Sequence, residues 1–353
     1  MEPLRNDRLV LVTGATGFVA GHVIKVLLEA KYHVRGTVRK VADTKKYEHL
    51  QNLPGATPET LQFVECDLNS TRGWDEACKG CTYLMHVASP FPATAVKNEE
   101  LELIKPAVEG TLIALEAAVK AGIKKAVVTS SCAAISYGHK AERYITSFSE
   151  KDWSDLTGVK GYEKSKTLAE KAVWDFHAKH GDKIEIATIN PALILGPTLS
   201  KNTFTSGDII EKMLKGDYPA LPKVSIGVVD VRDVATAHLL ALENPKSNGQ
   251  RYLLSEKTLW FGDIGQILGA EFKKYGYKIP STVVGKCPVW MMSIFDKQAK
   301  LILDSIGIFY RFDNSKSVNE LGIKYRPIET SLVEMGYSLI ECGSVPNKLK
   351  GKK

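Results

Sequence analysis

Tyr162 and Lys166 are the residues whose types and spacing most directly suggest chemistry. They lie four positions apart in GYEKSKTLAEKAVW, which has the pattern of an amphipathic helix, and such a pair shares one helix face. A phenol has a reference pKa of about 10 and is a poor acid near neutral pH unless a nearby cation stabilises its anion. Lys166 would supply that cation and could hold ribose hydroxyls. A Lys-rich surface helix shows the same spacing by chance, so the pair alone decides nothing.

Ser131 is the third candidate, and it closes the apolar run AVVTSS. Ligands bind at the carboxyl edge of a parallel sheet, where a serine either caps the backbone or faces a ligand. If Tyr162 and Lys166 face it, three polar groups converge on one carbonyl oxygen. Hydride addition to a carbonyl carbon puts negative charge on that oxygen, which then needs a proton and a hydrogen-bond donor. The three side chains therefore indicate carbonyl chemistry.

The elements that must position these residues alternate between short apolar runs and amphipathic helices. This order predicts a doubly wound parallel sheet of the Rossmann type, covered by helices on both faces. Residues 1–197 are expected to form this nucleotide-binding domain. The expected strands cover 9–13, 33–38, 61–66, 83–88, 126–131 and 184–190, and the expected helices cover 17–30, 44–51, 74–78, 99–121 and the stretch that begins at Tyr162.

Beyond Pro197 the alternation loosens, which predicts a smaller substrate lobe over 198–345 with some segments returning to the first domain. Residues 346–353 are expected to form a basic, solvated tail. In the Tyr162 helix, Ala169, Val173 and Phe176 are expected to face inward, and Glu163, Lys164 and Glu170 are expected to face solvent.

The first strand leads into VTGATGFVAG. Glycines at 14 and 17 allow a tight turn and close approach of a pyrophosphate, and the following helix offers free N–H groups to that anion. At the first strand–helix junction of a doubly wound fold, this pattern predicts dinucleotide binding. The residues expected to contact the dinucleotide here are Thr13, Gly14, Thr16, Gly17, Phe18 and Val19.

The end of the second strand, TVRK, predicts NADP(H) as the cofactor. An acidic residue there would favour NAD by accepting from the ribose 2′-OH, whereas Arg39 can hold a 2′-phosphate in bidentate fashion. Lys46 could reach the same phosphate, although both residues could also be plain exposed charges. Asp67 and Leu68 end the third strand, where adenine is expected, and Asp67 could equally cap the helix at Trp74.

The composition favours a globular protein that handles a small molecule. The net charge is +7, but the lysines are scattered, so we expect no nucleic-acid partner. No run of ~18 apolar residues exists and a strand pattern starts close to the N-terminus, which predicts a cytoplasmic protein without a membrane span. Six cysteines form no disulfide or zinc framework. Cys78 and Cys81 make a CxxC that is either a redox pair or two buried thiols.

These motifs together resemble the extended short-chain dehydrogenases/reductases, in particular the branch of dihydroflavonol reductases, cinnamoyl-CoA reductases and yeast-type carbonyl or aldehyde reductases. The resemblance covers nearly the whole chain. It rests on TGATGFVAG, RGTVRK, CDL (66–68), HVASP (86–90), KPAVEGT (105–111), VVTSS, YEKSKTLAE, NPALILGP (190–197), VDVRDVATAH (229–238) and NSKSVNELG (314–322).

The resemblance implies roles for individual residues. Ser131 would polarise the carbonyl, Tyr162 would act as the acid, and Lys166 would tune it. Further cofactor contacts are implied for Val87, Ala88, Ser89, Pro191 and Leu193. Asp233 is expected to cap a helix, and His238 to be a packed histidine.

Two positions depart from related branches. Ser136 stands where plant dihydroflavonol reductases carry Asn, which argues against a flavonoid substrate. Ala107 stands where nucleotide-sugar epimerases usually carry Asn, which argues against a UDP-sugar. The candidate pocket residues, Phe91, Ile135, Ser136, Tyr137 and Trp290, are mostly apolar, although the stretch 288–310 around Trp290 could be plain lobe core.

The sequence therefore predicts NADPH-dependent reduction of an aldehyde or ketone with hydrophobic substituents, by a monomer or homodimer that holds no metal. Three alternatives stay open. They are an alcohol or 3β-hydroxysteroid dehydrogenase working in the oxidative direction, a nucleotide-sugar epimerase or dehydratase, and a non-catalytic NADP sensor.

Overall fold

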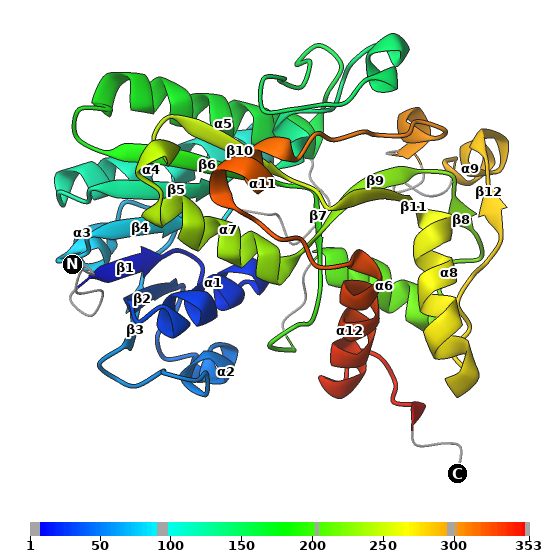
Figure 1. The fold of residues 1–353 in the computed structure, drawn as a ribbon, viewed down its shortest axis with the longest axis horizontal. Coiled ribbons are helices and arrows are strands. Elements are labelled where there is room, and N and C mark those ends of the chain that lie inside the picture. Colours follow the sequence, from blue (N-terminus) through cyan, green and yellow to red (C-terminus); the bar gives the residue numbers. More distant parts are fainter. Residues whose placement is uncertain (1–7, 90–97, 202–204, 295–299, 301, 350–353) are drawn as a thin grey trace.

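The computed structural model describes residues 8–89, 98–201, 205–294, 300 and 302–349. Its centre is a parallel sheet of seven strands in the order β10-β6-β5-β4-β1-β2-β3, which confirms the predicted fold class (Figure 1). The strands are β1 (Leu9–Val12), β2 (His33–Val38), β3 (Leu61–Glu65), β4 (Tyr83–His86), β5 (Lys125–Thr129), β6 (Glu185–Pro191) and β10 (Gln250–Leu254).

Helices cover both faces of this sheet (Figure 1). One face carries α3 (Trp74–Cys78), α4 (Lys105–Lys120) and α5 (Gly161–His180), and the other carries α1 (Phe18–Glu29) and α7 (Val231–Glu243). The alternation of strand side chains explains the two layers. Val10 and Val12 are buried in the core cluster under α1 and α7, whereas Leu11 between them is buried in the cluster under α4 and α5.

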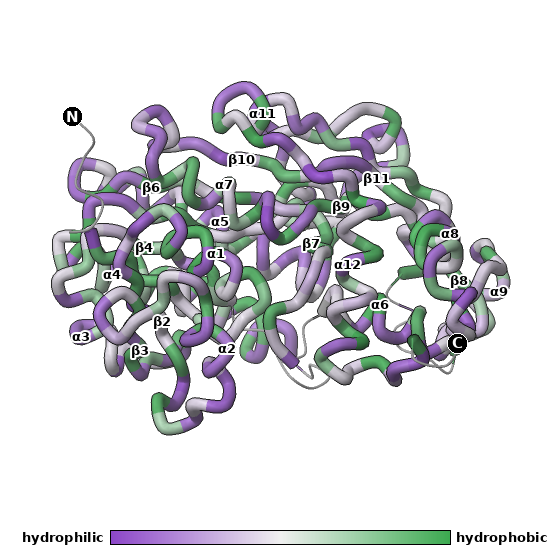
Figure 2. The backbone as a smooth tube through the Cα atoms, turned by 60° about the horizontal axis from the view of Figure 1, so that its bottom comes forward, coloured by the Kyte–Doolittle hydropathy of each residue, from purple (hydrophilic) through white to green (hydrophobic). Residues whose placement is uncertain are grey.

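A second group of elements follows β6 and lies to the right in Figure 1. Its core gathers side chains from α6, α8 and α12, including Met213, Leu268 and Leu332. Hydrophobic stretches gather toward the interior of both parts in Figure 2. The elements of this group are β7 (Leu193–Leu195), α6 (Thr205–Lys215), β8 (Leu221–Pro222), β9 (Ser225–Asp230), β11 (Lys257–Trp260), α8 (Phe261–Phe272), β12 (Val283–Val284), α9 (Lys286–Met292) and α12 (Ile328–Glu341). Helix α11 (Ser315–Leu321) returns to the large sheet, where it packs against β10 and α7.

Several predicted elements differ in detail. The helix expected over 44–51 is a 3₁₀ turn at Thr44–Lys46 followed by α2 (Glu48–Gln51). The helix expected from residue 99 begins with a π-helical turn at Glu100–Ile104, and Pro106 then sits in the first turn of α4, where its missing N–H costs little.

One local expectation is wrong. The N-cap of α7 is Asp230, whose side chain accepts from the Arg232 N–H, while Asp233 lies inside the helix and pairs with Arg326. In the described part of the tail, Pro346, Asn347 and Lys348 are exposed, and the Tyr277 hydroxyl donates to Pro346 O at 2.8 Å and accepts from Lys348 N at 3.1 Å.

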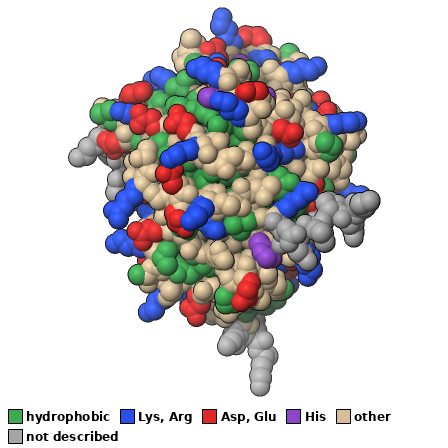
Figure 3. Space-filling model, turned by 90° about the vertical axis from the view of Figure 1, so that its left-hand side faces the viewer, with side chains coloured by type: hydrophobic (Ala, Val, Ile, Leu, Met, Phe, Trp, Pro, Cys, Tyr) green, Lys and Arg blue, Asp and Glu red, His purple; other side chains and the backbone are tan. Residues whose placement is uncertain are grey.

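Surface charge is mixed in sign on the face shown in Figure 3, where Lys and Arg side chains are interspersed with Asp and Glu. None of the helices within the described ranges is both long enough and apolar enough to span a bilayer.

Candidate active site

Ser131 follows β5 and adopts an extended backbone that starts the 3₁₀ turn Cys132–Ala134. Its hydroxyl caps this turn by accepting from Ala133 N at 3.1 Å. Its carbonyl accepts from the Asn190 amide of β6 at 3.3 Å. The hydroxyl is thus held on the carboxyl side of the sheet, where the doubly wound fold places ligands.

Tyr162 is the second residue of α5 and faces Ser131. The residue is 38% exposed, but its hydroxyl end is enclosed by protein, and this burial raises the pKa of Tyr162 to about 12. A hydrogen bond between the Ser131 and Tyr162 side chains opposes the rise, while Cys132 and Glu163 add to it. Burial outweighs every stabilisation of the phenolate, so Tyr162 is protonated at neutral pH.

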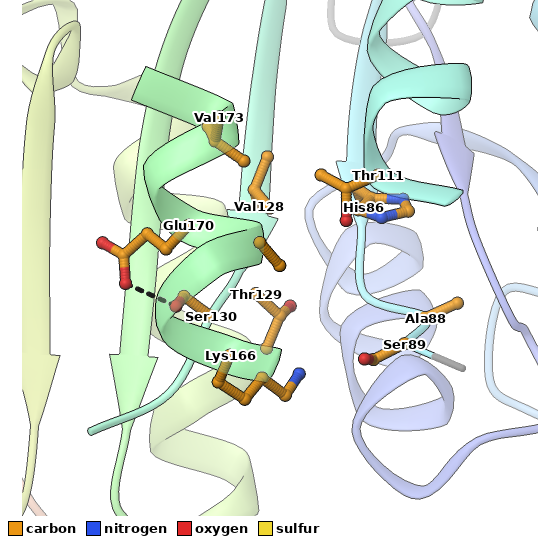
Figure 4. Close-up of a pocket in the computed structure, with 11 residues that line it drawn as sticks. His86, Ala88, Ser89, Thr111, Val128, Thr129, Ser130, Lys166, Glu170 and Val173 are labelled. Atoms are coloured by element: carbon orange, nitrogen blue, oxygen red, sulfur yellow. Dashed lines mark hydrogen bonds between the residues drawn. The ribbon is translucent and has the colours of Figure 1, made fainter. Parts of the chain in front are cut away.

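Lys166 lies one turn further along α5, with its Nζ 5.8 Å from the centroid of the Tyr162 ring. Burial lowers the pKa of Lys166 to about 8, and the carboxylate of Glu170 opposes that shift. Figure 4 shows Lys166 extending across a small cavity toward Ala88 and Ser89, which follow β4. Ser131, Tyr162 and Lys166 therefore lie together, as the sequence predicts.

The Gly-rich turn between β1 and α1 is shaped to receive a ligand. Gly14 has φ +65°, and a Cβ on it would lie 2.7 Å from the Cβ of Ala88. Gly17 is the N-cap of α1, and no side chain caps the helix there. An uncapped helix N-terminus beside a tight Gly turn fits a pyrophosphate, so the residues present fit a dinucleotide.

Thr13 is fully buried at this turn. Its hydroxyl accepts from the backbone N–H groups of Val87 and Ala88 at 3.0 Å and lies 3.2 Å from Nδ1 of His86. Thr13 thus fixes the segment after β4 against the Gly-rich turn. These hydrogen bonds hold the segment that contains three candidate cofactor contacts, Val87, Ala88 and Ser89. The other candidates, Thr16, Phe18 and Val19, lie at the start of α1.

Arg39 and Lys46 are both exposed just after β2. Lys46 pairs with Asp43 at 2.7 Å, on the surface. Asp67, also exposed, accepts from Asn69 N at 2.9 Å in a local turn. Asp67 does not cap α3, because the N-cap is Gly73. Leu68 is half-buried, with its carbonyl packed closely against Gly110 of α4.

Pro191 ends β6 and Leu193 begins β7, so the two residues occupy the point where the chain leaves the large sheet. The Ala192 N–H between them donates to Leu254 O of β10 at 2.9 Å. The segment predicted to meet the nicotinamide is therefore fixed by backbone bonds at the carboxyl edge of the sheet.

The candidate substrate residues lie in different settings. Ile135 and Ser136 are fully buried, and Tyr137 packs against Tyr310 with ring centroids 5.0 Å apart. Burial raises the pKa of Tyr137 well above its usual value, and the nearby Tyr162 phenol adds to this. Trp290 in α9 is 59% exposed, so it is not packed as lobe core. Phe91 falls outside the described residues.

Glu170 corrects the expected orientation of α5. The sequence pattern predicts a solvated carboxylate, but Glu170 is 2% exposed and accepts hydrogen bonds from Ser130, Asn190 and Arg251. The signal in the sequence was its spacing, because residues 162, 166 and 170 follow one another at i+4. Val173 and Phe176 are buried as expected, Ala169 is half-buried, and Glu163 and Lys164 are half-buried rather than solvated.

The other charged or reactive groups near the site are structural. His238 of α7 is fully buried between Thr129 Oγ1 (2.7 Å) and Val234 O (2.8 Å), as a packed histidine. Cys132, next to Ser131, is buried, and burial raises its pKa to about 12, which disfavours a reactive thiolate. Burial likewise raises the pKa values of Cys78 and Cys81 to about 12 and about 11. Across the described segments, no three His, Cys, Asp or Glu side chains gather as metal ligands.

The doubly wound fold and its Gly-rich turn are those of a dinucleotide-dependent oxidoreductase. The chain belongs to the NAD dependent epimerase/dehydratase family, whose pattern matches residues 10–254. It is therefore an NAD(P)-dependent enzyme of the extended short-chain dehydrogenase/reductase class, as the sequence motifs predict.

Individual relatives place the chain among the reductases of this class. It is 34% identical over 348 residues to cinnamoyl-CoA reductase CAD2 of Medicago truncatula, covering 97% of this chain and 98% of that protein. The structure of Gre2 from Candida albicans in complex with NADPH matches with a TM-score of 0.77 at 32% identity, covering 95% and 99% of the two chains. Yeast methylglyoxal/isovaleraldehyde reductase Gre2 complexed with NADPH also matches with a TM-score of 0.77, at 27% identity, over 94% and 98%.

Proposed function

We propose that the protein uses NADPH to reduce an aldehyde or ketone with hydrophobic substituents to the alcohol. The observation that carries this proposal is the grouping of Ser131, Tyr162 and Lys166 at one edge of the sheet, with a hydrogen bond between the Ser131 and Tyr162 side chains and Lys166 Nζ 5.8 Å from the Tyr162 ring centroid. Bound NADPH supplies the hydride to the carbonyl carbon.

The three side chains manage the charge that develops on the carbonyl oxygen. Tyr162, protonated because burial raises its pKa to about 12, gives its proton to that oxygen. Ser131 donates a second hydrogen bond to the same atom. Lys166, whose pKa of about 8 keeps it mainly charged near pH 7, favours the phenolate that Tyr162 leaves behind and can hold the ribose hydroxyls.

NADPH rather than NADH is supported by the exposed cations Arg39 and Lys46 after β2, with no carboxylate at the end of that strand. Two Gre2 structures that resemble this chain are complexes with NADPH. An aldehyde or ketone substrate is supported by the apolar, aromatic surroundings of Tyr137 and Tyr310 and by a structural relative named for methylglyoxal and isovaleraldehyde.

The test offers the protein a panel of aliphatic and aromatic aldehydes and ketones. The rate of reduction is measured from the fall in NADPH absorbance. We expect turnover with hydrophobic carbonyls, and a loss of at least about 100-fold in kcat for Tyr162→Phe, the range that general acid catalysis contributes. NADPH binding by Tyr162→Phe should persist. Tyr275→Phe is the matched control, because it makes the same change outside the site. Full turnover by Tyr162→Phe would refute the mechanism.

A further inference from the structure

Glu170 carries a buried negative charge in the middle of the catalytic helix. It lies one turn after Lys166 in α5. An ionised carboxylate out of water is costly unless it is paired and hydrogen-bonded. The donors that satisfy it are Ser130 Oγ (2.5 Å), Asn190 Nδ2 (2.6 Å), Arg251 Nε (2.6 Å), Thr188 Oγ1 (3.2 Å) and Trp174 Nε1 (3.3 Å).

Apart from Trp174, which lies in α5 itself, these donors come from the neighbouring strands β6 and β10 and from the residue that follows β5. Ser130 immediately precedes Ser131 at the end of β5, and Asn190 lies in β6. The Asn190 amide donates both to Glu170 and to the carbonyl of Ser131, at 3.3 Å. Figure 4 shows Glu170 hydrogen-bonded to Ser130 on one side of α5, while Lys166 of the same helix extends toward Ser89. The carboxylate thus joins the helix that carries Tyr162 to the strand end that carries Ser131.

Arg251 extends this connection to a loop beside the site. Its Nη1 donates to the carbonyls of Glu150 and Asp152, each at 2.7 Å, and its guanidinium lies 3.8 Å from the centroid of the Trp153 ring. The next residue, Ser154, donates to Ala133 O at 2.8 Å, in the turn that Ser131 caps. The loop 150–154 therefore contacts both Arg251 and the backbone next to Ser131.

We infer that Glu170 is a positioning residue, which uses Arg251, Ser130 and Asn190 to fix the place of Tyr162 and Lys166 relative to Ser131. This inference rests on the proposed function. Small misplacements of reacting groups are costly in rate, and hydrogen bonds to one carboxylate from four side chains outside α5, those of Ser130, Asn190, Arg251 and Thr188, leave α5 little freedom to rotate or slide. The negative charge one turn from Lys166 also opposes the effect of burial on the Lys166 ammonium.

A merely structural ion pair would affect the stability of the fold but not the titration of Lys166. The pH at which Lys166 titrates therefore depends on the charged groups that face it. On α5 itself Glu170 favours the ammonium, and from β4 the buried His86 shares the cavity with Lys166 and is held uncharged by burial, which lowers its pKa to about 4. Among the described residues that line this cavity Glu170 is the only acidic one, so its removal should move the Lys166 titration to lower pH.

The experiment compares Glu170→Gln, which keeps the shape and removes the charge, with Asp175→Asn, which makes the same change at an exposed position of α5. Trace labelling of lysines with acetic anhydride, resolved by mass spectrometry over pH 6–10, reports the titration midpoint of Lys166 without turnover. We expect a lower midpoint in Glu170→Gln alone. In Glu170→Gln we also expect kcat to fall about 10- to 100-fold, while the KM for NADPH changes less. When kcat/KM is plotted against pH, its alkaline limb should move to lower pH.

Ser130→Ala is the second variant, because it removes one hydrogen bond to Glu170 and keeps the pair with Arg251. If Glu170→Gln does not fold, a several-fold loss of kcat in Ser130→Ala with an unchanged Lys166 midpoint supports the positioning role. Wild-type midpoint and kcat in folded Glu170→Gln, or wild-type kcat in Ser130→Ala, would overturn the inference. If the wild type reduces no carbonyl, the proposed function fails, while the labelling still reports whether Glu170 controls Lys166.

Discussion

Oε1 of Glu170 in α5 lies 2.6 Å from Nε of Arg251 in β10, and both side chains are almost completely buried. The two residues are 81 positions apart in the chain. The ion pair connects the helix that carries Tyr162 and Lys166 with a strand that joins the large sheet only after the chain has built part of the second group of elements. The site is thus braced by a segment far from its motifs.

This ion pair predicts an asymmetric effect on stability. Arg251→Met should lower the free energy of unfolding by about 3–5 kcal/mol, because it leaves the Glu170 carboxylate buried without its counter-charge. The double variant Glu170→Gln/Arg251→Met should recover part of that loss, since no uncompensated charge remains. Urea unfolding of the single and double variants measures the coupling. Additive effects of the two substitutions would contradict the pairing.

Arg39 predicts the choice of coenzyme. Removing a charge-assisted hydrogen bond costs about 1.5–3 kcal/mol, so Arg39→Ala should raise the KM for NADPH by about 10- to 100-fold and leave the KM for NADH nearly unchanged. Lys40→Ala is the matched control, because Lys40 is the adjacent exposed cation. Steady-state kinetics with both coenzymes measure the effect. Equal losses for NADPH and NADH would show that Arg39 does not contact a 2′-phosphate.

Gly14 predicts a close backbone contact in the cofactor turn. Gly14→Ala meets both the left-handed backbone, at φ +65°, and Ala88, whose Cβ would lie 2.7 Å away. Gly80 also has a positive φ, +72°, but a Cβ there has open space. Gly80→Ala should therefore cost only about 1–2 kcal/mol of strain, whereas Gly14→Ala should in addition weaken NADPH binding at least about tenfold. Coenzyme fluorescence titration and thermal unfolding separate the two effects, and unchanged NADPH affinity in Gly14→Ala would count against the turn as its site.

Three buried histidines predict that the fold loses stability at acidic pH. Burial lowers the pKa values of His22, His86 and His238 from 6.5 to about 4 each. Between pH 6.5 and 4 the unfolded chain therefore binds more protons than the folded one, so stability falls as pH falls through this window. Each pKa unit corresponds to about 1.4 kcal/mol. His238→Gln should reduce the loss of unfolding free energy between pH 7 and pH 5, measured by urea titration, and an identical loss in this variant would contradict the assignment.

Motifs made from neighbouring residues could be predicted from the sequence. The Gly-rich turn, the Tyr162–Lys166 pair and Ser131 at a strand end each depend on local geometry, namely a strand–helix junction, one helical turn and the edge of a parallel sheet. The order of strands and helices likewise indicated the doubly wound sheet, because an apolar run buried on both faces has a distinct pattern. The sequence pattern places the cap of α7 three residues too late, since Asp230 and Asp233 are both acidic residues close to the start of the same helix.

Only the tertiary structure decided which polar groups are buried together. Glu170 has the sequence pattern of an exposed helix carboxylate, and its partners come from β5, β6 and β10. Local periodicity reports the face on which a residue lies but not what covers that face. The exposure of Trp290, in a stretch as apolar as a core, is another example. The sequence by itself determined the family, the cofactor turn and the candidate residues Ser131, Tyr162 and Lys166, whereas contacts between distant segments decided how those residues are held and charged, because burial and pairing arise only when the chain is packed.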